Sequence, residues 1–414
     1  MRSIRILFIS NFYPPHDLGG WEQNCQEVVQ RLTERGHVCH VITSRFGVQG
    51  PPPPELNVTR TLHLESDIYY YHPLDFFLRR PGQERANRAA LRTALDAFHP
   101  DMIFIWGLWN LSWQVAYWAE QWLPGRVAYA VAGYWFLSPN AHESYWQRMP
   151  RSIWARTLMA PARWQARRIL TKKRTQFPLT LSHVAFVSQY VRQKHQQAGI
   201  RPPDARVIYN GIDPYPFLPA AQRRKPAPDA LRLLYIGGLT PAKGVHVAIE
   251  ALGVLKRSEE LNNLSLRIVG GGQPDYENKL RQRVVDLGLE AYVTFQGREP
   301  RRKIPAIMAE HDVLLFTSIY EEPIARTVME GMAAGLAVIA TAVGGQAEML
   351  EDGANALVTP PGDVNALATT IVRLKRDTGL RRHLATAGRK TIQTHFTLKR
   401  MVDEIEAWLQ EIVV

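Results

Sequence analysis

Short apolar segments alternate with amphipathic helical segments through most of the 414-residue chain. This alternation is typical of parallel β-sheets that are covered by helices on both faces. The expected strands form two series: 4–9, 38–43, 102–106, 127–131, 184–187 and 207–209, then 231–236, 264–269, 292–295, 313–317 and 337–341. The sequence therefore predicts an α/β protein with two doubly wound units in succession.

Chain length and one turn-rich stretch indicate where the two units meet. A chain of 414 residues is too long for a single ordinary core and suits two domains of about 150–200 residues each. Residues 223–228 are rich in proline and basic side chains, and turn-forming residues precede them at 210–214. We therefore expect one domain over 1–206, a second over 214–390 and a hinge between them.

Composition excludes several classes of protein. Cys25 and Cys39 show neither a CxxC motif nor the Cys/His spacing of a metal site, so we expect a reducing, cytoplasmic setting without structural zinc. The apolar run Ile6–Ile9 is shorter than a signal-peptide core, and no apolar stretch approaches the ~18 residues that cross a bilayer. The formal net charge of +12 favours polyanionic partners: nucleic acid, an anionic membrane surface or phosphorylated substrates.

Basic and aromatic residues are concentrated in the segment 140–176. It contains nine Lys/Arg residues and one acidic residue, Glu143. Three tryptophans are interleaved with them: Trp146, Trp154 and Trp164. This combination suits an anionic membrane surface, and it also suits single-stranded nucleic acid. A solvated helical face whose tryptophans pack inward explains the pattern equally well, so all three interpretations stay open.

Two glycine-containing loops each follow an expected strand and precede a helix. The first reads NFYPPHDLGGWE and contains Gly19 and Gly20, which allow the backbone to approach a ligand, while the next helix offers free N–H groups to an anion. The second reads LLYIGGLTPAKG, in which Lys243 at the helix start suits a diphosphate. Neither loop matches GxGxxG. A plain turn for the first loop and a solvated lysine in the second remain alternatives.

Two glutamates lie eight positions apart in YEEPIARTVMEGMAAG. Glu322 is expected in the loop after the strand 313–317, and Glu330 about two turns into a helix over 325–334. A carboxylate that accepts from ribose hydroxyls, with phosphate at the helix N-terminus, is the physics of a nucleotide site. Alternatively, Glu330 is a buried residue satisfied by its neighbours and Glu322 is a surface charge.

Taken together and in order, these segments resemble the family 4 retaining glycosyltransferases of the GT-B fold. The resemblance extends from NFYPPHDLGGWE through VIYNGID and LLYIGGLTPAKG to EEPIARTVMEGMAAGLAVIATAVGGQAEMLEDG and the C-terminal helices. It implies two Rossmann-like domains that face a central cleft, with the acceptor bound by the first and the donor by the second. It also implies that a C-terminal helix within 391–414 packs back on the first domain.

The resemblance implies a reaction and its participants. The enzyme would be a retaining hexosyltransferase that moves a sugar from a nucleotide-diphosphate sugar to a hydroxyl of a glycan or lipid-linked acceptor, without a metal or other cofactor. We expect a cytoplasmic protein, peripheral at the inner membrane face through the segment 140–176, and no nucleic-acid partner.

The resemblance also assigns roles to matching residues. Glu330 would bind the ribose hydroxyls, and Glu322, the catalytic candidate, would face the donor sugar near its reactive carbon. The diphosphate would lie among Lys243 and the glycine loops, and the base beside the loop after residue 297. The full donor-binding set is Gly19, Gly20, Gly238, Lys243, Arg298, Glu299, Glu322, Pro323, Ile324, Ala325, Arg326, Thr327 and Glu330.

Two departures from the family pattern keep a second hypothesis open. Gly238 stands where family members commonly carry an arginine, and Ala132 and Gly133 stand where relatives often have a His-Asp pair. Neither alanine nor glycine has a side chain that titrates or donates a hydrogen bond. A GT-B module that binds sugar nucleotides without turnover is therefore the alternative to an enzyme.

Overall fold

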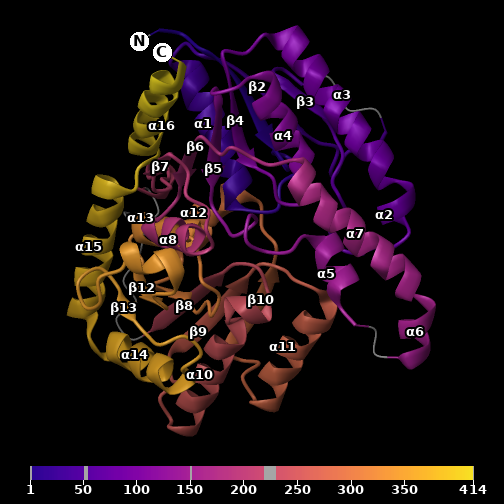
Figure 1. Cartoon of the computed structure of the whole chain (residues 1–414). Helices are drawn as coiled ribbons and strands as arrows, with labels where there is room; N and C mark the ends of the chain where they lie inside the picture. The colour runs from indigo at the N-terminus through magenta and orange to yellow at the C-terminus, as the bar shows by residue number, and fades with distance from the viewer. Residues whose placement is uncertain (1, 51–54, 150–151, 219–229, 414) are drawn as a thin grey trace. The chain divides into compact units, whose positions relative to one another are not determined.

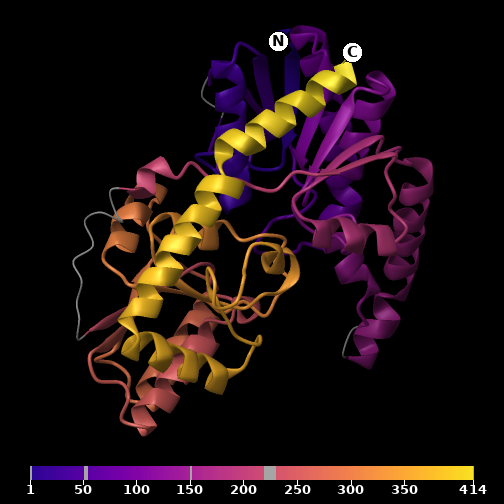
Figure 2. The same cartoon turned by 90° about the vertical axis from the view of Figure 1, so that its left-hand side faces the viewer.

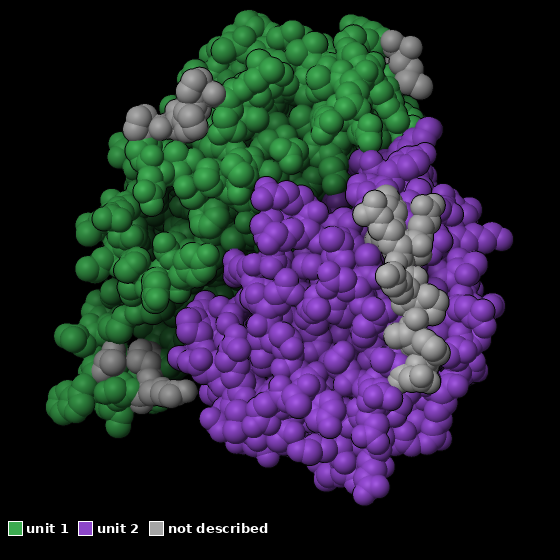
Figure 3. Space-filling model, turned by 180° about the vertical axis from the view of Figure 1, so that it is seen from behind, with its two compact units in different colours: residues 1–187, 191–208, 402–414 green, residues 188–190, 209–401 purple. Residues whose placement is uncertain are grey.

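The computed structural model describes residues 2–50, 55–149, 152–218 and 230–413, and Figure 1 shows the order of their helices and strands. The chain divides into two compact units, coloured separately in Figure 3. Unit 1 comprises residues 1–187, 191–208 and 402–414, and unit 2 comprises 188–190 and 209–401. The expected hinge at 223–228 lies outside the described residues.

Unit 1 is built on a seven-stranded sheet in which every pair of neighbouring strands is parallel. Its spatial order is β3-β2-β1-β4-β5-β6-β7. The central strand β4 is buried at all six positions, as expected for a parallel strand covered on both faces. The strands are β1 (Arg5–Ser10), β2 (Val38–Ser44), β3 (Val58–Leu62), β4 (Met102–Gly107), β5 (Val127–Val131), β6 (His183–Phe186) and β7 (Asp204–Val207).

The helices of unit 1 connect these strands, and the C-terminal helix joins them from the far end of the sequence. In α16 (Leu398–Val413), Trp408 is fully buried and donates from its indole nitrogen to Asp204 at 2.8 Å. Glu406 bonds the ring of His37 at 2.9 Å, and Figure 2 shows this end of α16 in yellow. The other helices are α1 (Gly20–Glu34), α2 (Asp75–Leu78), α3 (Arg80–Phe98), α4 (Trp113–Trp122), α5 (Ala141–Gln147), α6 (Ile153–Leu158), α7 (Ala160–Gln176) and α8 (Gln189–Gln197).

Unit 2 repeats the architecture with a six-stranded parallel sheet in the order β10-β9-β8-β11-β12-β13. Its strands are β8 (Leu231–Ile236), β9 (Leu264–Val269), β10 (Val293–Gly297), β11 (Val313–Phe316), β12 (Ala337–Ala340) and β13 (Leu357–Val358). Its helices are α10 (Val245–Arg257), α11 (Pro274–Asp286), α12 (Ile304–Ala309), α13 (Arg326–Ala333), α14 (Val364–Arg376) and α15 (Thr378–His395). Short 3-10 turns lie at η1 (Tyr215–Phe217), η2 (Pro241–Lys243), η3 (Arg301–Lys303) and η4 (Gly344–Glu348).

The predicted fold class, two doubly wound α/β units, is confirmed by these two sheets. Two strands were not predicted: β3, whose sequence VTRTL mixes polar and apolar residues, and the two-residue β13. Arg60 of β3 is only 2% exposed because its guanidinium pairs with Glu55 and donates to two backbone carbonyls. Among the helices that the structure describes, none combines the length and the apolar character that a membrane crossing requires.

Candidate functional site

Most of the predicted donor residues lie in unit 2, in loops that follow the carboxyl ends of adjacent strands. The loop after β8 leads to Lys243, the loop after β11 contains Glu322, and the loop after β12 contains Gly344 and Gly345. Because β8, β11 and β12 are neighbours in the sheet, their loops meet at one edge. In open parallel sheets, this edge is where ligands bind.

Glu322 and Lys243 contact each other across 79 positions of sequence. The Glu322 side chain is 8% exposed, and its Oε1 atom pairs with the Lys243 ammonium group. The same oxygen accepts a hydrogen bond from Ser318 Oγ at 2.9 Å. The alternative in which Glu322 is a surface charge is therefore wrong. Ser318 was not predicted, because a serine after a strand carries no distinctive signal in the sequence.

The loop that carries Glu322 is supported by the glycines after β12. Gly345 donates from its backbone nitrogen to the carbonyl of Glu322 at 2.8 Å, and the N–H of Ala325 donates to Gln346 Oε1 at 2.8 Å. A Cβ atom on Gly345 would overlap the carbonyl oxygen of Pro323. Only glycine permits this close approach, which explains why VGG accompanies the EEPIA segment.

The predicted residues from 323 to 327 form the entry to α13. Ile324 and Ala325 are buried, and Ala325 has the extended backbone of a helix N-cap. Arg326 and Thr327 occupy the first turn, where backbone N–H groups have no acceptor within the helix. This helix start lies four residues after Glu322 and offers a partial positive charge to an anion.

Glu330 lies in α13 and is 2% exposed. Its carboxylate accepts from Arg326 Nε at 2.7 Å and from one nitrogen of Arg301 at 2.6 Å, and a second Arg301 nitrogen also contacts it. Burial alone would raise the pKa of the Glu330 carboxyl, but the charges and hydrogen bonds of Arg301 and Arg326 outweigh burial and lower it. The carboxylate is therefore ionised, and a ribose hydroxyl would share it with the guanidinium groups.

Arg301 was missed by sequence analysis. It belongs to the basic run RRK in η3, which has the pattern of a solvated surface. Its partner lies 29 residues later, so only the fold reveals the pair. The alternative in which Glu330 is satisfied by its neighbours describes the structure in part, and the prediction that it binds ribose stays a prediction.

Arg298 and Glu299 lie in the loop after β10. Arg298 is exposed and lies close to Gly271. A Cβ atom added to Gly271 would lie 2.8 Å from the Nε atom of Arg298. Glu299 accepts from Gln296 at 2.8 Å and pairs with Lys303 at 3.0 Å, and these hydrogen bonds lower the pKa of its carboxyl. The contacts of Glu299 are therefore within its own part of the chain.

The second glycine loop is compact except at Gly238. The hydroxyl of Tyr235 lies 3.1 Å from the carbonyl oxygen of Gly238 and 3.4 Å from that of Lys243. Gly244 has a left-handed backbone, with φ of 67°, and a Cβ atom there would overlap the Thr317 carbonyl. At Gly238, by contrast, a Cβ atom would meet open space, so the loop has room for the arginine that this chain lacks.

Gly19 and Gly20 belong to unit 1, at the start of α1. Gly19 is the N-cap, and its N–H donates to Glu22 Oε2 at 3.0 Å. Burial raises the pKa of the Glu22 carboxyl to about 7, despite opposing backbone hydrogen bonds. Glu22 was not among the predicted site residues. The structure thus brings together Lys243 with Glu322 and Arg326 with Glu330, whereas the Gly19–Gly20 loop lies in the other unit.

Neither a metal site nor a disulfide is present in the parts of the chain that the structure describes. No group of three or more His, Cys, Asp or Glu residues among them has the arrangement of a metal site. Cys25 and Cys39 are both buried and free.

Two family models match consecutive parts of the chain. The model described as Glycosyltransferase Family 4 matches residues 18–215, and the model described as Glycosyl transferases group 1 matches residues 220–391. Together the two matches run over most of the sequence.

The chain is also similar to individual glycosyltransferases. The chain is 31% identical over 191 residues to the amylovoran biosynthesis glycosyltransferase AmsK of Erwinia amylovora, covering 45% of this chain and 46% of that protein. The chain likewise spans about half the length of several other curated relatives that it matches. It is 24% identical to the D-inositol 3-phosphate glycosyltransferase of Stackebrandtia nassauensis, over 94% of this chain and 86% of the relative.

A solved structure supports the fold independently. The Anabaena protein Alr3699/HepE, crystallised with UDP and glucose, superposes with a TM-score of 0.70 at 22% identity, over 98% of this chain and 99% of that chain. At this identity the likeness establishes the fold alone. The two family matches show that this chain belongs to the group 1 and family 4 glycosyltransferases, and the superposition shows that it has their GT-B fold.

Proposed function

We propose that this protein is a retaining glycosyltransferase that moves a hexose from a nucleotide-diphosphate sugar to a hydroxyl of a glycan or lipid-linked glycan. The observation that carries the proposal is the contact of Lys243 with Glu322 beside the N-terminus of α13. This arrangement combines a cation and backbone donors, which suit a diphosphate, with a carboxylate that suits sugar hydroxyls.

The chemistry follows from where charge develops. When the bond from the sugar C1 atom to the diphosphate oxygen breaks, negative charge accumulates on the leaving diphosphate. The Lys243 ammonium group and the first-turn N–H groups of α13 would stabilise that charge and so lower the barrier. In the account usual for this family, the diphosphate oxygen takes the proton of the acceptor hydroxyl on the same face, which gives retention. We propose that Lys243 and these N–H groups suffice without a metal ion.

The relatives support a sugar-nucleotide donor and a glycan product. Alr3699/HepE was crystallised with UDP and glucose, and AmsK is an amylovoran biosynthesis glycosyltransferase. By analogy, we propose a role in polysaccharide biosynthesis. The relatives do not share one acceptor, since another relative is a D-inositol 3-phosphate glycosyltransferase.

Turnover separates the enzyme from a module that only binds sugar nucleotides. We would measure release of nucleoside diphosphate from UDP-, GDP-, ADP- and dTDP-sugars by the wild type, by Glu322→Gln and by Glu321→Gln as the matched control. Glu321 is the adjacent, exposed carboxylate. We expect the wild type to consume one of these donors. Glu322→Gln should lower kcat/KM for that donor by about 100-fold or more, whereas Glu321→Gln should keep a kcat/KM close to that of the wild type. Tight nucleotide binding without turnover would favour the non-catalytic module.

We also propose that α6 and the start of α7 lie against an anionic membrane surface, at the inner face of the cell membrane. Ile153, Trp154 and Leu158 are between 73% and 85% exposed, and Trp164 is 64% exposed. Single exposed apolar residues are ordinary, but a cluster of large ones marks an interaction surface. The interpretation in which all three tryptophans pack inward is wrong, because only Trp146 is buried.

Charge favours a membrane as the partner of this surface. Arg156, Arg168 and Lys172 are exposed on the same two helices, and Arg168 lies 5.4 Å from the centroid of the Trp164 ring. Basic residues beside tryptophan and leucine attract anionic headgroups while the apolar side chains enter the interface.

Vesicle sedimentation tests this surface. We expect binding to phosphatidylglycerol vesicles, weak binding to phosphatidylcholine vesicles, and a loss of binding of about tenfold or more in Trp154→Ser/Leu158→Ser. Leu56→Ser is the control, because Leu56 is 91% exposed elsewhere in unit 1. Equal binding by both variants, or tighter binding to a single-stranded oligonucleotide with a steep salt dependence, would contradict the proposal.

A further inference from the structure

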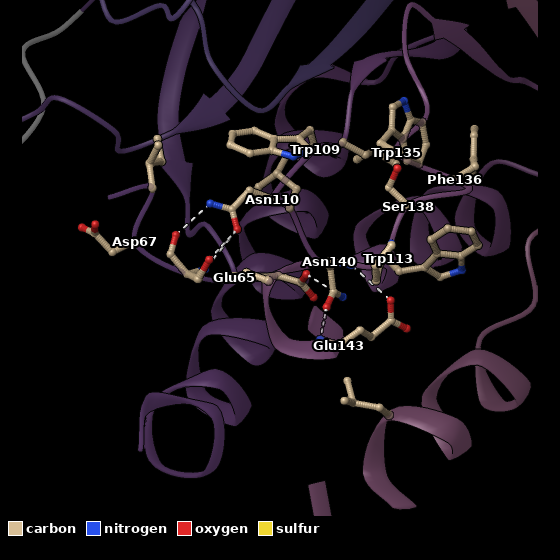
Figure 4. A pocket seen from close by; sticks show the side chains of 17 residues that line it. Glu65, Asp67, Trp109, Asn110, Trp113, Trp135, Phe136, Ser138, Asn140 and Glu143 are labelled. Atoms are coloured by element: carbon tan, nitrogen blue, oxygen red, sulfur yellow. Dashed lines mark hydrogen bonds between the residues drawn. The ribbon is translucent and has the colours of Figure 1, made fainter. Parts of the chain in front are cut away.

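Unit 1 contains a cavity of about 180 Å³ that none of the predicted donor residues lines. It lies among the loops that follow β3, β4 and β5, at the carboxyl ends of these strands (Figure 4). An isolated bridge between Leu64 and Leu111 joins the loop after β3 to the loop after β4. The cavity therefore occupies the ligand-binding edge of this sheet.

Hydrogen bonds fix the polar side chains on one side of the cavity. Asn110 donates from Nδ2 to the carbonyl of Ser66 at 2.7 Å and accepts from the Ser66 hydroxyl at 3.0 Å. The Asn140 side chain donates to Glu65 Oε2 at 3.2 Å, and the backbone N–H of Asn140 donates to Glu143 Oε2 at 3.1 Å. Glu65 and Glu143 are each only 8% exposed. The carboxylates are thus held in place and present hydrogen-bond acceptors.

Aromatic rings form much of the remaining lining. Trp109 is 50% exposed and Trp113 is half-buried, and both line the cavity. In Figure 4, the indoles of Trp109 and Trp135 lie across the cavity from Glu65, Asn140 and Glu143. A flat apolar ring opposite carboxylate and amide groups suits a ligand with one apolar face and a rim of hydroxyls, which is the surface of a sugar ring.

The charge of the lining limits the ligand further. Of the 17 residues that line the cavity, three are acidic, Glu65, Asp67 and Glu143, and none is Lys, Arg or His. This sign opposes the formal charge of +12 of the whole chain, so it is not a by-product of overall composition. A phosphate or carboxylate placed here would be desolvated beside like charges without a cation to compensate.

We propose that this pocket binds the acceptor, and that the acceptor is a sugar ring without negative charge rather than a phosphorylated or acidic sugar. The inference rests on the proposed glycosyltransferase function and names its acceptor class. An uncharged acceptor would distinguish this chain from relatives such as the D-inositol 3-phosphate glycosyltransferase.

Direct binding tests the pocket without requiring turnover. Saturation-transfer NMR would compare methyl glycosides of glucose, galactose, mannose and N-acetylglucosamine with their 6-phosphates, on the full chain. We expect at least one uncharged glycoside to bind, its 6-phosphate to bind at least tenfold more weakly, and Trp109→Ala to reduce glycoside binding at least tenfold. Tyr215→Ala, which removes an aromatic side chain 74% exposed in unit 2, is the control and should bind as wild type.

Two results would overturn the inference: 6-phosphates that bind as well as the uncharged glycosides, or unchanged glycoside binding by Trp109→Ala. Hydrolysis of the donor by water is measured on the same samples. Because the proposed function assigns donor hydrolysis to unit 2 residues such as Glu322, hydrolysis together with failed glycoside binding would contradict the pocket alone. Its absence with intact glycoside binding contradicts the proposed function instead.

Discussion

Three buried glutamates have different partners, and the partners decide what each carboxylate does. Glu330 is surrounded by two guanidinium groups and stays ionised. Glu322 pairs with the Lys243 ammonium group and the Ser318 hydroxyl, so its carboxylate keeps the capacity to accept a hydrogen bond from a substrate. Glu22 accepts from a backbone N–H, and burial raises the pKa of its carboxyl.

The first prediction concerns the charge balance at Glu330. Replacing it with alanine leaves Arg301 and Arg326 without their common counter-charge, so Glu330→Ala should lower the free energy of unfolding by about 3 kcal/mol or more. Glu310→Ala is the matched control, because Glu310 pairs with Arg267 at an exposed position and should contribute less than about 1 kcal/mol. Urea unfolding measures both changes in the free energy of unfolding. Equal changes in the two variants would contradict the role of Glu330 as the buried counter-charge of Arg301 and Arg326.

The second prediction concerns the pH dependence at Glu22. Its carboxyl has an ordinary pKa of 4.5 and a folded-state pKa of about 7, so the folded state binds the proton more tightly. The protonated side chain therefore supports the fold fully below pH 4.5, and this stability is lost as pH rises to about 7. Glu22→Gln keeps an oxygen for the Gly19 N–H and cannot ionise.

The difference between this variant and the wild type isolates the effect. The gain in unfolding free energy from Glu22→Gln should be about 2 kcal/mol larger at pH 8 than at pH 5. Other titrating groups cancel in the comparison. A gain that does not change with pH would show that Glu22 titrates normally.

At the scale of elements, the candidate site of unit 2 is built from loops that approach each other closely. η2 is followed by Gly244, which lies against the end of β11, and the glycines of η4 lie against the loop that carries Glu322. Lys243 precedes Gly244 directly, so the position of the ammonium group depends on this close approach.

The third prediction separates close approach from backbone conformation. Gly244 and Gly353 both have left-handed φ angles, but a Cβ atom would overlap the Thr317 carbonyl at Gly244 and meet nothing within 4 Å at Gly353. In both alanine variants, the Cβ atom on a left-handed backbone should lower the free energy of unfolding by about 1–2 kcal/mol. Only Gly244→Ala should also lower kcat/KM for the donor, by about tenfold or more. Equal donor kinetics in the two variants would contradict this role for Gly244.

Sequence patterns predicted those elements whose residues are uniformly apolar. β1 and β4 contain ILFI and MIFIW and were placed within a residue or two. β3 was missed because the partners of Arg60 come from other segments, so the arginine looks exposed in the sequence. Lys243 and Glu322 were predicted to belong to one site, but their direct contact was not predicted. Arg301 was not predicted at all. Both failures have one cause, because the pairing of side chains from different loops depends on the assembled sheet.

At the scale of the whole molecule, opposite charges are distributed to different places. The chain is basic overall, and exposed basic residues, among them Arg156, Arg168 and Lys172, accompany the apolar residues of α6 and α7. The cavity after β4 and β5 is acidic within the same unit. The proposed membrane surface is basic and the proposed acceptor pocket is acidic, so together the two proposals predict an uncharged acceptor glycan that is held at a membrane.

The central claim, retaining transfer from a nucleotide-diphosphate sugar, is tested most directly by proton NMR of the reaction. The protein is incubated with the donor that it consumes and with uncharged alkyl glycosides, and the anomeric signal of the new linkage is followed. The account predicts a product with the same anomeric configuration as the donor, formed by the wild type and strongly reduced in Glu322→Gln. An inverted product, or no transfer with any of the four nucleotide types despite nucleotide binding, would contradict it.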